Sequence, residues 1–272
     1  MRKILNLLIY IILVVVGIVM VFPFIWMLFS AFKTPAEIQS LPPTFLPQKP
    51  TLNNFRYVLS QGLFLRWYMN SLIVALVVTV SVALFASLSG YALAKFRFPG
   101  RKFIFIGILS TMMVPLQMLI IPWYIACVKL SLVDTYLGIA FPGLISAFGV
   151  FLMRQFMLTL PDDLLDAARI DGASELRIFF TVVIPLVKPA LATLAIFTFI
   201  SNWDAFLWPL IITSSPSMRT LPVGLQFFAD QFGVQFHYIM AASALVVLPV
   251  FFVFFVLQRQ IIRGVTLSGL KQ

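Results

Sequence analysis

The fold is decided by an apolar run that contains no polar side chain, Leu72-Ile73-Val74-Ala75-Leu76-Val77-Val78. A transmembrane β-strand would instead alternate polar and apolar residues over about ten positions. A helix pairs all of its own backbone groups, so it can hold such a run in lipid without leaving a donor or acceptor unsatisfied. The run therefore predicts a membrane-spanning helix.

The composition of the 272 residues agrees with this prediction. Apolar residues make up 61% of the chain, charged residues make up 10%, and the mean hydropathy is +1.05. So little polar surface cannot cover a soluble globule. A helix needs about 20 apolar residues to cross roughly 30 Å of hydrocarbon. We therefore predict an all-α polytopic membrane protein with six transmembrane helices, approximately Ile9–Ala31, Asn70–Leu93, Phe103–Cys127, Val133–Met153, Ala190–Thr213 and Ile239–Ile262.

The basic residues predict the orientation of these spans. The first span follows Arg2 and Lys3 as in a signal peptide, but its apolar stretch is too long for a cleaved one. We read the first span as an uncleaved signal anchor. With its N-terminus inside, 13 of the 19 Lys and Arg residues fall on the inner side of the membrane. Because basic loops stay inside, we expect both termini in the cytoplasm.

The net charge of +10 does not indicate nucleic-acid binding, because the basic residues are scattered over loops and form no stripe with aromatic residues. We expect no nucleic-acid partner. Cys127 and His237 are the single cysteine and the single histidine of the sequence. A protein-built zinc site is therefore not expected.

A polar segment between the fourth and fifth spans concentrates the negative charge of the chain. Five of the nine acidic residues lie within 14 positions: Asp162, Asp163, Asp166, Asp171 and Glu175. Thr159 and Asp162 have the spacing of a capping box, Gly172 permits a sharp reversal, and Ser174 can cap a second helix. We predict a helix–turn–helix on the inner face that presents a small apolar surface rimmed by charge. Such a surface suits insertion into a cleft of another protein.

Polar and aromatic residues near the end of the fifth span form a second candidate site, a possible translocation pathway comprising Asn202, Trp203, Asp204 and Trp208. An acid within a membrane is a functional candidate, although near the outer end it can equally be hydrated or paired. Tryptophans here, and Trp123 in the third span, suit stacking on a sugar ring. They also suit the aromatic belt at a membrane interface, which is the more common role.

Several motifs resemble one transporter family. The segment Asp166-Ala167-Ala168-Arg169-Ile170-Asp171-Gly172-Ala173, followed by Ile184-Pro185, is similar to the Glu-Ala-Ala loop of permease subunits in binding-protein-dependent ABC importers. Asp166 replaces the leading glutamate. Tyr91-Ala92-Leu93-Ala94-Lys95-Phe96, Asn202-Trp203-Asp204-Ala205-Phe206 and Arg263-Gly264-Val265-Thr266-Leu267-Ser268-Gly269 extend the match in the same order. The chain thus resembles the MalG-like permeases of maltose-type carbohydrate importers.

This resemblance implies the parts of a bacterial or archaeal plasma-membrane complex. The expected partners are a second, MalF-like permease, two ATP-binding subunits and an external solute-binding protein, in a lipid bilayer. The residues implied in coupling to the ATPase are Asp162, Asp166, Ala167, Ala168, Arg169, Asp171, Gly172 and Pro185. Asp166 is expected to pair with a basic ATPase residue. The tail implied to reach between the ATPase subunits includes Thr266, Ser268, Gly269 and Lys271.

The predicted function is that of a permease subunit importing a sugar or oligosaccharide. We expect no enzymatic activity and no cofactor in this chain, because it contains no phosphate loop; Mg-ATP would bind the partner subunits. The same architecture importing a polyol or a sugar phosphate such as glycerol 3-phosphate is an alternative. A stand-alone secondary carrier is less favoured, because residues 70–153 lack mid-membrane ionisable groups. The expected divisions are 1–69 for the first span and external loop, 70–262 for the transmembrane core with its coupling loop at about 159–189, and 263–272 for the tail.

Overall fold

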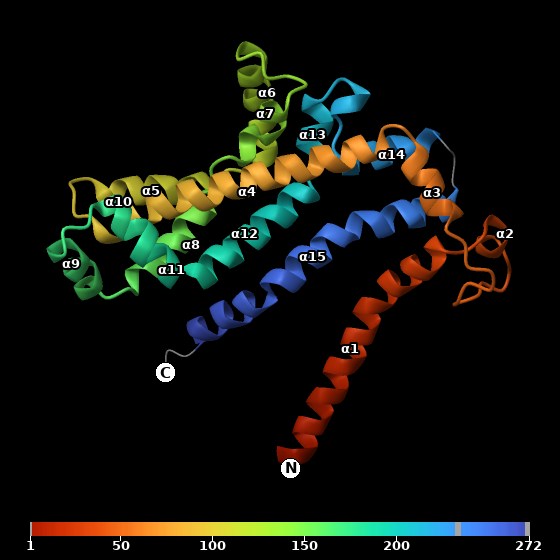
Figure 1. Cartoon of the computed structure of the whole chain (residues 1–272), viewed down its shortest axis with the longest axis horizontal. Coiled ribbons are helices and arrows are strands. Elements are labelled where there is room, and N and C mark those ends of the chain that lie inside the picture. The colour runs from red at the N-terminus through yellow and green to blue at the C-terminus, as the bar shows by residue number, and fades with distance from the viewer. Residues whose placement is uncertain (1, 232–234, 270–272) are drawn as a thin grey trace. The chain divides into compact units, whose positions relative to one another are not determined.

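The computed structural model describes residues 2–231 and 235–269, and side chains at 5–226, 235–256 and 258. Every regular element in these ranges is helical, and no strand occurs among them (Figure 1). This confirms the all-α prediction. The longest helices are α1 (Arg2–Ala31), α4 (Phe64–Lys95) and α15 (Phe236–Gly269). The shorter elements are α2 (Pro35–Ile38), α3 (Asn53–Ser60), α5 (Arg101–Thr111), η1 (Leu116–Leu119), α6 (Ile120–Lys129), α7 (Tyr136–Ala140), η2 (Phe141–Gly143), α8 (Ala147–Leu158), α9 (Asp162–Ile170), α10 (Glu175–Ile178), η3 (Phe179–Val183), α11 (Ile184–Leu186), α12 (Lys188–Trp203), α13 (Leu207–Ile212), η4 (Pro216–Met218) and α14 (Leu221–Gln231).

Three helices in the described residues are long and apolar enough to cross a membrane, and the number rises to as many as six if each bent helix pair is one span. The predicted third span is such a pair, because α5 and the segment Leu116–Lys129 meet at 93°. Pro115 stands at this break and lacks the N–H that a continuous helix would need. The predicted fourth span bends by 51° between η2 and α8. The third bent pair joins Glu175–Leu186 to α12 at 82°. The predicted fifth span is itself divided, because α12 ends at Trp203 and α13 begins at Leu207.

The chain divides into two compact units. The first comprises residues 1–65 and 224–249. Within it, the buried Asn54 of α3 donates hydrogen bonds to the carbonyls of Ala31 and Lys33, both at 2.8 Å, and so joins α3 to the end of α1. Tyr57 of α3 stacks on Tyr238 of α15 with ring centroids 3.9 Å apart. Residues 52–59, which follow a proline-rich segment, mix apolar and aromatic residues with Arg56 and so predict a short surface helix; the structure forms it as α3.

The second unit comprises residues 66–223 and 250–272 and contains both candidate sites. Its core is centred on α4, α8 and α12 (Figure 1). A Cβ atom at Gly90 of α4 would lie 2.9 Å from the backbone nitrogen of Arg154 and from the Cβ atom of Met153 in α8. The glycine thus permits the close helix approach that small residues provide in membranes. This packing fixes the end of α4 beside the segment that follows α8.

Candidate functional site

The predicted helix–turn–helix is present as α9 and α10, joined by a tight turn; we call residues 159–178 the helical elbow. Gly172 has φ +78°, a left-handed conformation that favours glycine. Its N–H donates to the carbonyl of Arg169, and the N–H of Ala173 donates to the carbonyl of Ala168, both at 3.0 Å. Ser174 caps α10 by accepting a hydrogen bond from the N–H of Arg177. The predicted reversal at Gly172 and the predicted helix cap at Ser174 are therefore confirmed.

The prediction that Thr159 and Asp162 form a capping box at the start of the elbow is wrong. The hydroxyl of Thr159 donates to the carbonyl of Phe156 and so closes the end of α8, and α9 starts after Pro161 without a side-chain cap. Asp162 forms an ion pair with Lys95 instead, which local spacing does not reveal. Asp162 and Asp163 still occupy the first turn of α9, where their charge favours the helix dipole.

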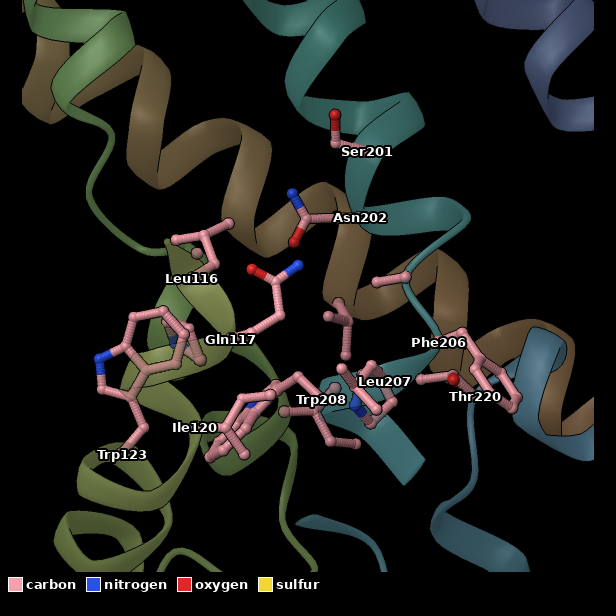
Figure 2. Close-up of a pocket in the computed structure, with 16 residues that line it drawn as sticks. Leu116, Gln117, Ile120, Trp123, Ser201, Asn202, Phe206, Leu207, Trp208 and Thr220 are labelled. Carbon is pink, nitrogen blue, oxygen red and sulfur yellow. The ribbon is translucent and has the colours of Figure 1, made fainter. Parts of the chain in front are cut away.

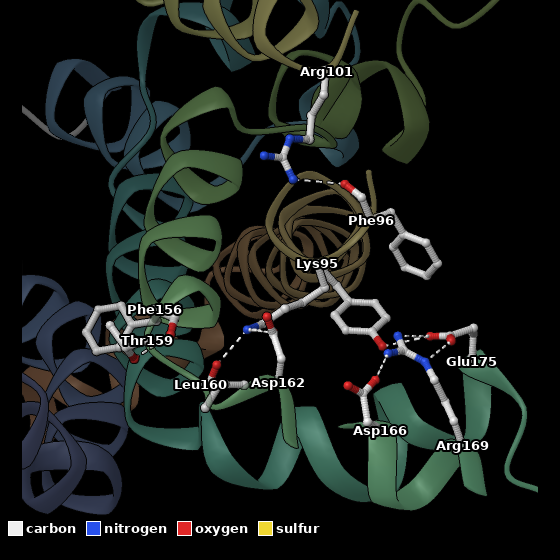
Figure 3. A network of polar contacts seen from close by, with 11 residues as sticks. Lys95, Phe96, Arg101, Phe156, Thr159, Leu160, Asp162, Asp166, Arg169 and Glu175 are labelled. Atoms are coloured by element: carbon white, nitrogen blue, oxygen red, sulfur yellow. Dashed lines mark hydrogen bonds and ion pairs between the residues drawn. The ribbon is translucent and has the colours of Figure 1, made fainter. Parts of the chain in front are cut away.

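Lys95 is the last residue of α4 and joins that helix to the elbow (Figure 3). Its Nζ atom lies 2.6 Å from the Leu160 carbonyl oxygen and 2.6 Å from Oδ1 of Asp162. The side chain of Lys95 is only 6% exposed, whereas that of Asp162 is 69% exposed. The hydrogen bond and positive charge of Lys95 lower the pKa of Asp162. This contribution of the pair to stability is therefore present above the ordinary aspartate pKa and is lost as the pH falls through the lowered value.

Arg169 organises the second part of the elbow network (Figure 3). Its guanidinium lies 2.6 Å from Oδ1 of Asp166 and 2.7 Å from Oε1 of Glu175. The hydroxyl of Tyr91 in α4 donates to Oε2 of Glu175 at 2.8 Å. The hydrogen bonds of Glu175 and Asp166 raise the pKa of Arg169, which is charged in any case. The network ties α9, α10 and α4 together. Asp166 thus has a partner within the chain, which the sequence did not predict.

The two faces of α9 differ in exposure. Leu165 is 1% exposed and belongs to the core that contains Tyr91 and Ile178, and Ala168 packs against that core. Ile170 at the end of the same helix is 86% exposed, and Leu164 of α9 and Leu176 of α10 are also exposed. One face therefore holds the elbow to the protein, while the other presents an apolar surface with Asp163, Asp166 and Asp171 exposed around it.

The other predicted coupling residues are distributed as follows. Ala167 is exposed on α9, Asp171 ends that helix, and Pro185 is exposed on α11, beyond the elbow. Helix α15 continues through Gly269, but the side chains of Thr266 and Ser268 are outside the described ones. Lys271 lies outside the described residues altogether.

The structure separates the four predicted pathway residues. Asn202 and Trp208 line a cavity of about 360 Å³, which we call the first cavity (Figure 2). Trp203 is completely buried, stacks on Phe199 and meets the ring of Tyr68 edge-on. Asp204 caps the end of α12, is exposed and is not among the residues that line the cavity.

Lys95 allows a direct test of how α4 holds the elbow. We expect Lys95→Met to loosen the elbow, because the Leu160 carbonyl and the Asp162 carboxylate lose their shared donor while the apolar stem is retained. Trypsin should then cleave after Arg169 several times faster in the purified protein. Lys102→Met is the matched control, because Lys102 is exposed on α5. Equal cleavage rates in both variants would show that Lys95 does not hold the elbow.

Comparison with known proteins places this geometry in a family context. Residues 83–267 match the family model described as "binding-protein-dependent transport system inner membrane component". The arabinooligosaccharides transport system permease protein AraQ of Halalkalibacterium halodurans is 37% identical over 259 residues, covering 94% of this chain and 93% of the relative. The sn-glycerol-3-phosphate transport system permease protein UgpE of Yersinia pestis bv. Antiqua is 35% identical over 271 residues, covering 97% and 96%. A chain from the crystal structure of a bacterial ABC transporter involved in import of the acidic polysaccharide alginate superimposes with a TM-score of 0.86 at 26% identity, covering 94% of this chain and 96% of that one.

Proposed function

The chain belongs to the family of binding-protein-dependent transport system inner membrane components, and from this premise we propose that it imports a sugar or oligosaccharide as the permease subunit of an ATP-driven transporter. It is a membrane component and not the ATPase. We place Mg-ATP on partner subunits and no cofactor on this chain. The relatives that transport arabinooligosaccharides and alginate support a carbohydrate as the solute.

The helical elbow is the observation that carries this proposal. It is a charged unit that an ion pair and a hydrogen bond tie to α4, and it presents the exposed side chains of Leu164, Ile170 and Leu176. Small apolar surfaces rimmed by charge are suited to protein docking. An ATPase subunit that moves the elbow would pull on Lys95 and Tyr91, and so on α4. This is rigid-body gating of the kind that two-state transporters use.

The remaining partners follow from the same assignment. The family description itself names a binding protein, which we place on the outer face. A second, MalF-like permease would complete the pathway, and two ATP-binding subunits would dock on the elbows. The chain is a multi-pass inner-membrane protein. We propose cytoplasmic N- and C-termini in a bacterial or archaeal cell, with residues 1–69, 70–262 and 263–272 as the functional divisions.

A sugar phosphate is the second candidate solute. The relative that transports sn-glycerol 3-phosphate matches nearly the whole chain at 35% identity. Phosphate binding generally uses Arg or Lys at the site, either from this chain or from the partner permease.

Co-purification tests the architecture. The chain should be isolated together with a second six-span permease and an ATPase, and the complex should hydrolyse ATP faster when a loaded secreted binding protein is added. An active transporter made of this chain alone would contradict the proposal.

A further inference from the structure

A second cavity of about 550 Å³ adjoins the first. The two share the wall residues Leu116, Trp123, Pro142, Gly143, Ser201 and Asn202. Along α4 the first cavity reaches Val74 and the second reaches Val82, a separation of about 12 Å at the rise of an α-helix. Both volumes fall within the roughly 300 to 1,000 Å³ of small-molecule sites. Placed one after the other along α4, the two cavities suit a chain of linked rings better than a single small ion.

Thr220 supplies an unused hydrogen-bonding group in the wall of the first cavity (Figure 2). The residue is 2% exposed, and its hydroxyl has no hydrogen-bond partner among the described residues. The backbone on both sides is held by α4: the amide of Asn70 donates to the carbonyl of Arg219 at 2.9 Å, and the N–H of Leu221 donates to the hydroxyl of Ser71 at 2.8 Å. A buried hydroxyl without a partner is unfavourable, so a rigidly held one suggests a polar ligand.

Trp123 offers an aromatic surface shared by both cavities. Trp208 is immobilised by the hydrogen bond from its indole N–H to the Gly138 carbonyl at 3.0 Å, and its ring meets Trp123 edge-on at 6.0 Å. Figure 2 shows the amide of Gln117 directed toward Asn202 between these walls. An aromatic plane beside amides and a hydroxyl is the combination that binds the C–H face and the hydroxyl groups of a sugar.

The charge of the walls discriminates between solutes. Among the described side chains that line either cavity, none is acidic or basic. A phosphate or a uronate would find no cationic partner on this chain in either cavity, and a charge left uncompensated in such surroundings is strongly disfavoured. An uncharged sugar meets no such penalty.

We propose that the two cavities form a binding site for an uncharged oligosaccharide, in which Trp123 stacks on a sugar ring and Thr220, Gln117 and Asn202 bind its hydroxyl groups. The assignment rests on the importer function proposed above and narrows its solute to the neutral class. It also makes this subunit a direct contact of the solute.

The test uses the complete transporter in proteoliposomes with its loaded binding protein. The uncharged probes are a panel of pentose and hexose trisaccharides; the anionic probes are sn-glycerol 3-phosphate and an alginate oligosaccharide. We expect uptake of an uncharged trisaccharide only. Trp123→Ala should lower uptake at subsaturating solute about tenfold, while Trp123→Phe retains most of it, because a ring is preserved. Tyr124→Ala is the matched control on α6, because Tyr124 is exposed and lines neither cavity.

Thr220→Val separates a ligand role from a structural one. Removing an unpaired buried hydroxyl should leave the melting temperature of the complex unchanged or raise it, while uptake falls about three- to tenfold. Thr193→Val, which removes a hydroxyl bonded to the Pro189 carbonyl, should not affect uptake. Two outcomes would overturn the cavity assignment and leave the importer function standing. One is ATP-driven uptake of an anionic probe with no uptake of any uncharged probe. The other is equal uptake of an uncharged probe by the wild type and by Trp123→Ala. Failure to assemble with an ATPase would contradict the importer function itself.

Discussion

Asp166→Lys is expected to uncouple ATP hydrolysis from transport while membrane insertion stays intact. Asp166 is exposed on α9 and accepts a hydrogen bond from Arg169 at 2.6 Å. A lysine there would repel Arg169 and reverse the charge offered to an ATPase subunit. Losing one partner of a hydrogen-bonded charge pair in an interface costs about 2 to 5 kcal/mol, so affinity for the ATPase should fall at least about 30-fold. ATP hydrolysis, solute transport and ATPase binding are measured in the reconstituted complex.

Two controls define this result. Asp166→Glu keeps the charge and should retain transport. Asp163→Lys changes the net charge equally at a neighbouring exposed position and should have a much smaller effect. If Asp166→Lys bound the ATPase subunit as well as the wild type does, the Asp166 carboxylate would not contribute to ATPase docking.

Leu165→Asp is expected to detach the elbow from the body of its unit. Leu165 is 1% exposed and lies in the core with Tyr91 and Ile178. Removing a buried leucine and burying a carboxylate without a partner should destabilise the docked α9 by roughly 3 kcal/mol or more. Trypsin cleavage after Arg169 should then become much faster, and transport should be lost.

Leu164→Asp is the matched control, because Leu164 is the adjacent leucine on the exposed face. It should leave trypsin cleavage close to that of the wild type, even where it weakens ATPase docking. Similar cleavage of the two variants would mean that α9 is not held through its buried face.

The sequence predicted the features that depend on composition and on neighbouring residues. Long apolar runs must form helices in lipid, so the all-α fold followed from segments such as residues 72–78. The turn at Gly172 and the cap at Ser174 are local as well, because each is set by the conformation of a few adjacent residues. The same segment carried part of the family resemblance.

Tertiary structure alone decided which distant groups meet. Lys95 and Asp162 are 67 positions apart and Tyr91 and Glu175 are 84 apart, so no local spacing could pair them. For the same reason, the sequence could not show that Asp162 pairs with Lys95 and does not form a capping box. Packing likewise buried Trp203, left Asp204 exposed, and placed Thr220 beside Trp123 and Asn202 in one cavity. The physical reason is that helix formation depends on a residue's own neighbours, whereas a site depends on how several helices pack.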